Sequence, residues 1–324
     1  MDFGEILLRA ARITWRYKTL WWLGLLPGLT HVATVLARFW FTGYASREIR
    51  PLLADLVTGQ PTLEQWLLSP EFSQAFLNGR FLFFLLVWLF LAAVVFWLLV
   101  TLAEAALIAA TLGIVNDRPI TVGRALAVGR RFLSRFIAID ALVFLPWFVI
   151  ALAAMGILAV SVGATAVLAT QETTTGALLA SLGLGLSCAG LLACLLIPVS
   201  FVSVRYRTLA FRDTAVAGGT TRQSVRHTWQ VVRRHLAEVI IFLAILWGLN
   251  YIFNLLLSLI SLPLGLATAV PALLSFSPAG SGPTLTLANL VGLGTAVLLA
   301  VPQALLFVYV GVVWTLAYLE WNEA

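Results

Sequence analysis

Five ionisable side chains lie inside long apolar stretches of this 324-residue chain, namely His31, Arg38, Glu104, Asp140 and Glu238. A charged group in hydrocarbon is costly, so each invites a functional interpretation such as proton relay or ion transport. Glu104 is the strongest candidate, because it lies deepest in an unbroken apolar run. The alternative is a structural ion pair with arginines near the membrane surface. We favour that alternative for Asp140 and Glu238, which directly follow basic stretches, and also for Glu104, whose helix is long enough to lift it towards the same arginine-rich surface.

Uncharged polar residues accompany these groups. Asn250 and Asn254 are four residues apart, so they share one face of a helix, where amides commonly bond between helices. We take Glu104, Asp140 and Asn250 together as the candidate intramembrane polar site. The sequence has no P-loop, nucleophile elbow, zinc-protease, paired-cysteine or dinucleotide motif. We therefore predict a protein that is not an enzyme, with no catalytic, cofactor-binding or metal-binding residues and no cofactor.

The elements that position these residues must be membrane helices. Hydrophobic residues make up 61% of the chain and charged residues 10%, and the mean hydropathy is +1.00. Soluble domains contain about 25% charged residues. About 20 apolar residues cross the hydrocarbon core as a helix. We predict an all-α integral membrane protein with six transmembrane helices, in the ranges 19–41, 81–113, 137–168, 176–204, 238–262 and 289–318.

Sixteen of the twenty lysines and arginines fall in three basic stretches: before the first predicted crossing, between the second and third, and between the fourth and fifth. Because positive residues stay on the cytoplasmic side, we predict that these stretches and both termini are cytoplasmic. We expect the leading stretch to be retained and not cleaved as a signal peptide. The excess of arginine over lysine is typical of GC-rich prokaryotes, which indicates a prokaryotic inner membrane.

Each basic stretch has the period of an amphipathic helix, with apolar residues opposite arginines. We predict three cytoplasmic interfacial helices that bind anionic lipid headgroups. The candidate headgroup contacts are Arg9, Arg12, Arg16, Arg124, Arg131, Arg135, Arg222, Arg226 and Arg233. Nucleic acid is not predicted as a partner of this +6 chain, because the arginines adjoin apolar spans.

Each interfacial helix leads into two crossings, which indicates a threefold repeat of interfacial helix plus hairpin. The repeat units of this single membrane domain, 1–324, are about 1–113, 114–204 and 205–324. The alternative is that any inner loop of a membrane protein is basic and amphipathic.

Two outer segments remain. Segment 42–80 is predicted to contain short helices, because Thr62 with Gln65 forms a capping box and Pro70 follows an N-cap serine. Segment 263–288, which holds four prolines, is interpreted as interfacial, re-entrant or a docking surface.

Two runs carry a family resemblance: ARITWRYKTLWWLG at 11–24, and the third basic stretch with RYRTLAFR at 205–212, SVRHTW at 224–229 and RRHL at 233–236. They resemble a group of uncharacterised six-helix prokaryotic membrane proteins. That group is similar to the membrane domain attached to some glycerophosphodiester phosphodiesterases and, more distantly, to YciC-like inner-membrane proteins. The phosphodiesterase catalytic domain has no counterpart in these residues. The resemblance therefore implies an architecture and not that activity.

Two function classes follow. The favoured one is a non-enzymatic integral membrane protein that serves as a scaffold or accessory subunit of a membrane complex. Its partners would be membrane lipids and either other membrane subunits or further copies of the chain. The alternative is a transporter or lipid-handling protein, which requires a cavity that reaches Glu104 or Asn250.

Overall fold

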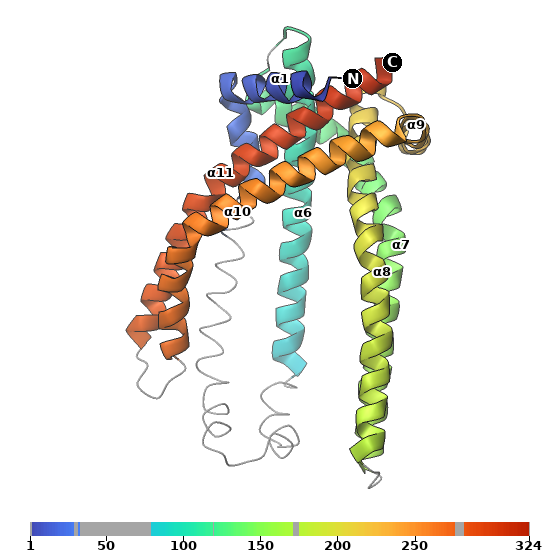
Figure 1. Ribbon diagram of the computed structural model, residues 1–324, viewed down its shortest axis with the longest axis vertical. Helices are drawn as coiled ribbons and strands as arrows, with labels where there is room; N and C mark the ends of the chain where they lie inside the picture. The colour runs from blue at the N-terminus through green and yellow to red at the C-terminus, as the bar shows by residue number, and fades with distance from the viewer. Residues whose placement is uncertain are drawn as a thin grey trace. The chain divides into compact units, whose positions relative to one another are not determined.

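The computed structural model describes residues 2–28, 32, 79–118, 120–170, 175–275 and 282–323. Throughout that part of the chain the regular structure is helical, without a strand. The helices are α1 (Phe3–Arg16), α6 (Gly79–Val115), α7 (Val122–Thr170), α8 (Thr175–Ala217), α9 (Thr221–Arg234), α10 (Leu236–Ser275) and α11 (Gly282–Glu323), as Figure 1 shows. Residues 19–28 form a further helical segment directly after α1.

Four of the described helices are long and apolar enough to cross a membrane, over Phe90–Val115, Val122–Ile157, Leu236–Ala267 and Leu290–Asn322. The chain therefore has the character of a multi-pass membrane protein. The predicted crossing at 19–41 is described only for 19–28 and residue 32. The one at 176–204 lies in α8, where the apolar helix found is Gly183–Leu192.

The second basic stretch differs from the prediction, because it does not form a separate helix. The 49 residues of α7 run without a break from Val122 through Arg135 into the apolar span. Nothing at Arg135–Phe136 interrupts the backbone hydrogen bonds, whereas the other two stretches end in a turn at Tyr17–Lys18 and at His235. At 1.5 Å per residue α7 is about 74 Å long, more than twice the hydrocarbon thickness.

The described parts of segment 263–288 are helical. Residues 263–275 complete α10 and residues 282–288 begin α11, while Pro278 lies outside the described residues. The interfacial, re-entrant and docking interpretations all stay predictions. Pro263 is inside helical structure. An apolar environment favours this outcome, because backbone groups without a hydrogen bond are costly in lipid and proline is tolerated within membrane helices. Residues 42–78, where short helices are predicted, lie outside the described residues. His31 and Arg38 lie outside them as well.

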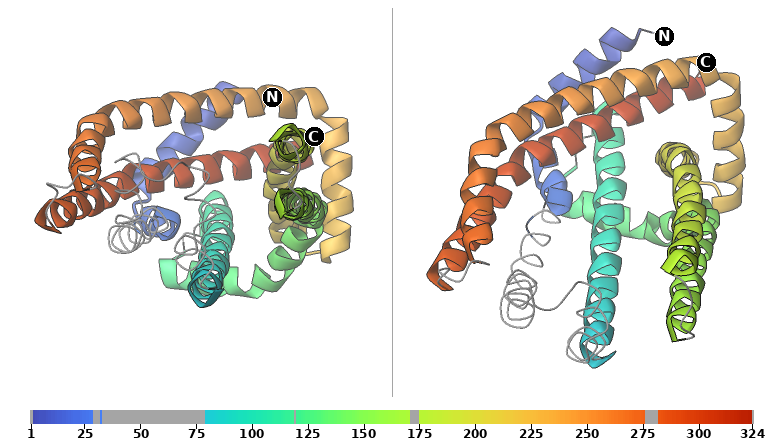
Figure 2. Two further views of the ribbon diagram at one scale, coloured as in Figure 1. Left: turned by 90° about the horizontal axis from the view of Figure 1, so that it is seen from below. Right: turned by 60° about the horizontal axis from the view of Figure 1, so that its bottom comes forward.

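The chain divides into two compact units. The first unit comprises Met1–Gly129 and Ala237–Val313, and the second comprises Arg130–Leu236 and Trp314–Ala324. In the first unit α10 and α11 run side by side, and in the second α7 and α8 do so (Figures 1 and 2). The three-part repeat stays a prediction.

The first unit packs its helices through small residues. A Cβ atom added to Gly24 would lie 2.7 Å from Val308 Cγ2 and would also meet the carbonyl oxygen of Ala304. One added to Gly129 would lie 2.8 Å from the backbone nitrogen of Ala106. Small residues at such contacts let membrane helices approach closely. Thus residues 19–28 pack against α11, and the start of α7 packs against α6.

Helix α1 folds against this unit with one face only. The Asp2 carboxylate caps it by accepting hydrogen bonds from the backbone N–H groups of Gly4 (2.9 Å) and Glu5 (3.2 Å). Its buried residues, Ile6, Ala10, Ile13 and Thr14, recur at three- and four-residue intervals. At its end the Trp21 indole donates a hydrogen bond to the Thr14 carbonyl over 2.9 Å, which holds the corner into residues 19–28.

The core of the second unit is aromatic. The rings of Phe136 on α7 and Phe211 on α8 stack with centroids 3.9 Å apart, and both are fully buried. Trp314, Tyr318 and Trp321 of α11 are buried as well. This core positions the polar side chains described next.

Candidate functional site

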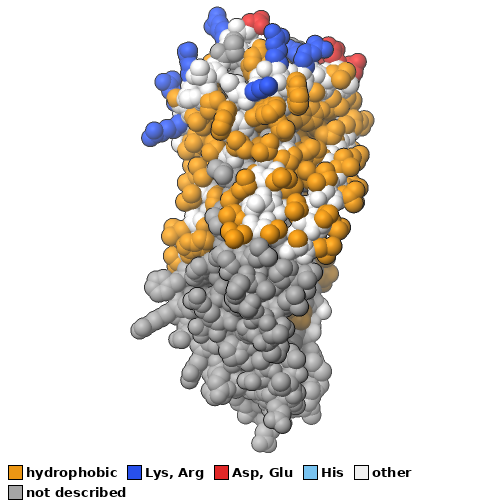
Figure 3. All heavy atoms as spheres, turned by 90° about the vertical axis from the view of Figure 1, so that its left-hand side faces the viewer, with side chains coloured by type: hydrophobic (Ala, Val, Ile, Leu, Met, Phe, Trp, Pro, Cys, Tyr) orange, Lys and Arg blue, Asp and Glu red, His pale blue; other side chains and the backbone are white. Residues whose placement is uncertain are grey.

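The nine arginines predicted to contact lipid headgroups are all exposed. Those of α1 and α9 lie opposite the buried faces of their helices. On the face in Figure 3, basic side chains gather at one end and hydrophobic side chains cover the adjoining band. Arg135 also contacts another helix boundary, because its guanidinium donates to the carbonyls of Gly218 (3.0 Å) and Gly219 (3.3 Å). It therefore holds the turn between α8 and α9.

Asp140 forms an ion pair with Arg207 in the second unit. The carboxylate is 1% exposed and accepts hydrogen bonds from Nε and Nη2 of Arg207. The same guanidinium lies over the Phe211 ring, 4.3 Å from its centroid. Asp140 follows Phe136 by four residues on α7, and Phe211 follows Arg207 by four residues on α8. Residues four apart lie on the same face of a helix, so each helix presents one charged and one aromatic side chain to the other. The arrangement is a link between α7 and α8.

A second buried carboxylate joins three helices. Asp213 of α8 accepts a hydrogen bond from the Tyr318 hydroxyl of α11 and one from His227 Nδ1 of α9, the latter over 2.5 Å. Its side chain is 2% exposed and that of His227 is 46% exposed. Because an ionised carboxylate only accepts hydrogen bonds, the contact requires a hydrogen on Nδ1 of His227.

Next to this cluster is a polar hollow of about 190 Å³. Its lining residues are His227, Gln230, Val231, Arg234, His235, Trp321 and Asn322, among which there is no carboxylate. The aspartate–histidine pair resembles half of an acid–base constellation. In the described part of the chain, however, the hydrogen bond of the imidazole goes to Asp213 and to no hydroxyl or thiol. The observed geometry is that of an inter-helix link.

Tyr206 extends the cluster towards the start of α9. Its hydroxyl donates to the carbonyl of Val225, and its ring meets Trp229 edge-on with centroids 6.3 Å apart. Burial raises the pKa of Tyr206 to about 12, and the negative charge of Asp213 adds to the rise. The phenol is therefore neutral at physiological pH.

The three members of the candidate intramembrane polar site lie on three different helices. Glu104 is buried in α6 of the first unit, with 7% of its surface exposed. Asn250 lies on α10, where the amide of Asn254 donates to its carbonyl over 2.8 Å and to its side-chain oxygen. Asp140 belongs to the second unit and is paired with Arg207.

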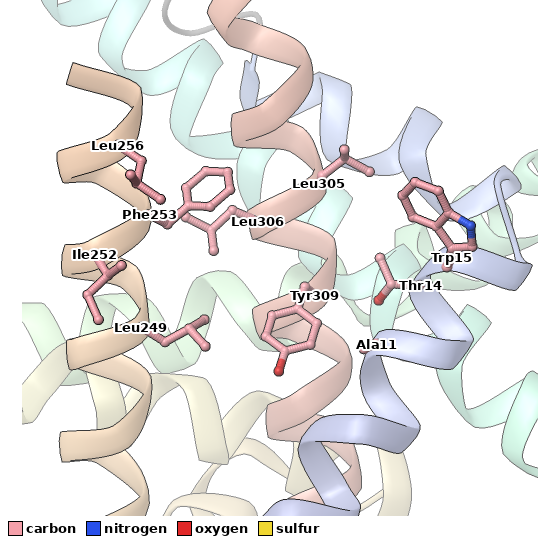
Figure 4. Close-up of a pocket in the computed structure, with 10 residues that line it drawn as sticks. All are labelled: Ala11, Thr14, Trp15, Leu249, Ile252, Phe253, Leu256, Leu305, Leu306 and Tyr309. Carbon is pink, nitrogen blue, oxygen red and sulfur yellow. The ribbon is translucent and has the colours of Figure 1, made fainter. Parts of the chain in front are cut away.

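An apolar groove lies between α1, α10 and α11 of the first unit (Figure 4). Its volume is about 410 Å³. The lining residues are Ala11, Thr14 and Trp15 of α1, Leu249, Ile252, Phe253 and Leu256 of α10, and Leu305, Leu306 and Tyr309 of α11. Neither Glu104 nor Asn250 lines it, so this is not the polar cavity that solute transport requires.

Sequence reasoning missed the residues that organise both regions. Asp213 is part of the basic stretch, and the charge pattern alone gave no indication that its side chain is buried. Thr14 and Tyr309 are far apart in sequence, so no local pattern indicates that they share a groove. Within the described residues no group of three or more histidines, cysteines or carboxylates is arranged to hold a metal ion.

Comparisons with protein-family models, curated proteins and solved structures find no significant match to this chain. The function must therefore be argued from the residues themselves.

Proposed function

We propose that this chain is a non-enzymatic, multi-pass integral membrane protein that serves as a scaffold or accessory subunit of a membrane complex. The observation that carries the proposal is that two buried carboxylates link neighbouring helices. Asp140 and Asp213 both bond to side chains of neighbouring helices instead of lining an accessible cavity. Charged groups committed in this way stabilise an arrangement of helices and are not free to react.

The full proposed topology has six crossings, with the termini and basic stretches at the cytoplasmic face of a prokaryotic inner membrane. Helices α1 and α9 are the proposed interfacial helices, together with the basic start of α7. Their exposed arginines, on the side opposite the buried face, support contact with anionic lipid. The resemblance to a membrane domain without its phosphodiesterase partner agrees with a module that supports other proteins.

The test is isolation of the tagged full-length protein from native membranes in mild detergent, followed by native mass spectrometry. We expect a stoichiometric complex with another membrane protein or a defined homo-oligomer. A matched variant, Arg222→Gln with Arg226→Gln, should retain that assembly if lipid contact is the role of these arginines, while binding less well to anionic vesicles. A monomer without any partner would contradict the scaffold proposal.

A lipid-handling role is the second candidate, and the apolar groove between α1, α10 and α11 is the observation that favours it. Reconstitution into phosphatidylcholine vesicles that contain 10% fluorescent phosphatidylglycerol tests this role. Faster exchange of the labelled lipid between leaflets than in protein-free vesicles would support lipid movement. Equal rates would leave the groove as a static site and would argue against this candidate.

A further inference from the structure

We propose that the groove between α1, α10 and α11 is a binding site for one acyl chain of an anionic phospholipid, with its headgroup at Arg12 and Arg16 of α1. The inference rests on the proposed membrane placement of α1, α10 and α11. It holds for a scaffold as well as for a lipid-handling protein.

The walls of the groove suit a hydrocarbon chain. Leu256 follows Leu249 by seven positions on α10, which is roughly 10 Å along the helix axis. Phe253 and Leu306 extend the same apolar surface, and Figure 4 shows Tyr309 between Leu249 and Ala11. Ile252 and Leu256 are 59% and 54% exposed, so the open side of the groove is apolar too.

The lining of the groove suits an acyl chain, because a hydrocarbon chain has no polar group that would lose its hydrogen bonds against an apolar wall.

Two hydroxyl groups mark a polar end on the α1 side. The hydroxyl of Thr14 is buried without a hydrogen-bond partner, and the residue is 7% exposed. The hydroxyl of Tyr309 donates to the carbonyl of Leu7 over 3.5 Å, which is long for a hydrogen bond. Buried polar groups are normally satisfied, so an unpaired hydroxyl at an apolar groove indicates a missing acceptor. The ester carbonyls of a phospholipid supply such acceptors.

Charge next to the groove selects an anionic headgroup. Arg12 adjoins Ala11 in sequence, and Arg16 adjoins Trp15; both arginines are exposed. Trp15, 69% exposed, is an aromatic residue of the kind enriched at the boundary between headgroups and hydrocarbon. A guanidinium forms strong paired hydrogen bonds with phosphate. A phosphatidylglycerol headgroup would therefore be held more tightly than a zwitterionic one.

The experiment titrates the full-length protein in detergent with phosphatidylglycerol whose acyl chains carry bromine, a tryptophan quencher. We expect a saturable quenching component that Trp15→Phe removes. Ala11→Phe, which fills the groove, should abolish it, and Ala153→Phe, at an exposed position of α7, should leave it unchanged. Thr14→Val keeps the side-chain shape and should weaken binding about fivefold by removing one hydrogen bond. Quenching of wild-type strength in both Ala11→Phe and Thr14→Val would overturn the site.

Further arms separate the alternatives. Brominated phosphatidylcholine should bind at least fivefold more weakly, and Arg12→Gln with Arg16→Gln should bring phosphatidylglycerol to the same level; equal binding of both lipids by the wild type would overturn the headgroup assignment. Glycerol phosphate at millimolar concentration should not compete, and competition would show that the phosphate binds without the chain. A loss of dimers in Ala11→Phe without any lipid-dependent quenching would assign the groove to a second copy.

Membrane extraction with carbonate distinguishes failure of this site from failure of the proposed function. Wild-type protein that stays in the membrane but shows no saturable quenching would overturn the lipid site alone. Wild-type protein released by carbonate would overturn the membrane placement on which both proposals rest.

Discussion

At the residue scale, two buried carboxylates link the helices of the second unit. Asp140 pairs with Arg207 between α7 and α8, and Asp213 joins α8 to His227 of α9 and Tyr318 of α11. Removing one of these carboxylates should cost more free energy of unfolding than its hydrogen bonds contribute, because its partners are left buried without an acceptor. These two positions should therefore dominate the mutational sensitivity of the second unit.

We predict that Asp213→Asn destabilises the protein by about 2 kcal/mol, since it turns charge-assisted hydrogen bonds into weaker neutral ones. Denaturant unfolding in detergent, followed by circular dichroism, measures the change. Asp117→Asn is the control, because Asp117 is exposed at a left-handed position, φ 54°, that asparagine also tolerates. An equal loss in both variants would mean that the bonds of Asp213 carry no special weight.

The pKa of Tyr206 gives a prediction in alkaline solution. Since its pKa is raised from 10.0 to about 12 in the folded protein, the unfolded chain releases this proton first as the pH rises. The stability contribution is present in full below pH 10 and is lost between pH 10 and 12. Tyr206→Phe should therefore lose less stability over that window than the wild type. Parallel curves of unfolding midpoint against pH would disprove the assignment.

At the element scale, close helix contacts depend on glycines, and two of them offer a matched comparison. Gly24 meets Val308 and the Ala304 carbonyl on α11, whereas nothing lies within 4 Å of the Cβ position of Gly248 on α10. Residue type and helical setting are the same, so only the neighbouring atoms differ. The contrast isolates the contribution of packing.

We expect Gly24→Ala to destabilise the first unit by about 1–3 kcal/mol through overpacking. Gly248→Ala should be neutral or stabilising by up to about 1 kcal/mol, because alanine favours the helix more than glycine does. Thermal unfolding in the same detergent provides the comparison. The packing account fails if the two substitutions shift the unfolding temperature in the same direction.

At the scale of the whole molecule, the proposed topology requires α8 to cross the membrane. Four crossings have described helices that meet the length and hydropathy required, and the proposed topology adds 19–41 and 176–204. If α8 crosses, residues before it and after it lie on opposite sides. A chemical label that does not enter the membrane can distinguish these cases.

Single cysteines in a Cys188→Ala and Cys194→Ala background provide the measurement. Glu5→Cys and Arg222→Cys should react with an impermeant maleimide only from the cytoplasmic side. Thr58→Cys and Thr173→Cys should react only from the outside. Labelling of positions 173 and 222 from the same side would show that α8 does not cross and would reduce the topology to fewer spans.

The sequence alone determined the membrane class and the helical character, because apolar length and charge are properties of contiguous residues. It also located the amphipathic periods of α1 and α9. It was misleading where a helix could continue. The basic residues before Phe136 are part of the same helix as the apolar span that follows, and α10 continues past Pro263. Backbone hydrogen bonding in an apolar setting outweighed both local signals.

Only the tertiary structure decided which polar groups meet. Asp213, His227 and Tyr318 come from three helices, and Thr14 and Tyr309 line the same groove although they are far apart in the sequence. Contacts between distant segments depend on how whole helices pack, and a helical period predicts which face is buried without naming its partner. For that reason the charge pattern of this chain predicted its basic faces, while the inter-helix links and the proposed lipid site required the fold.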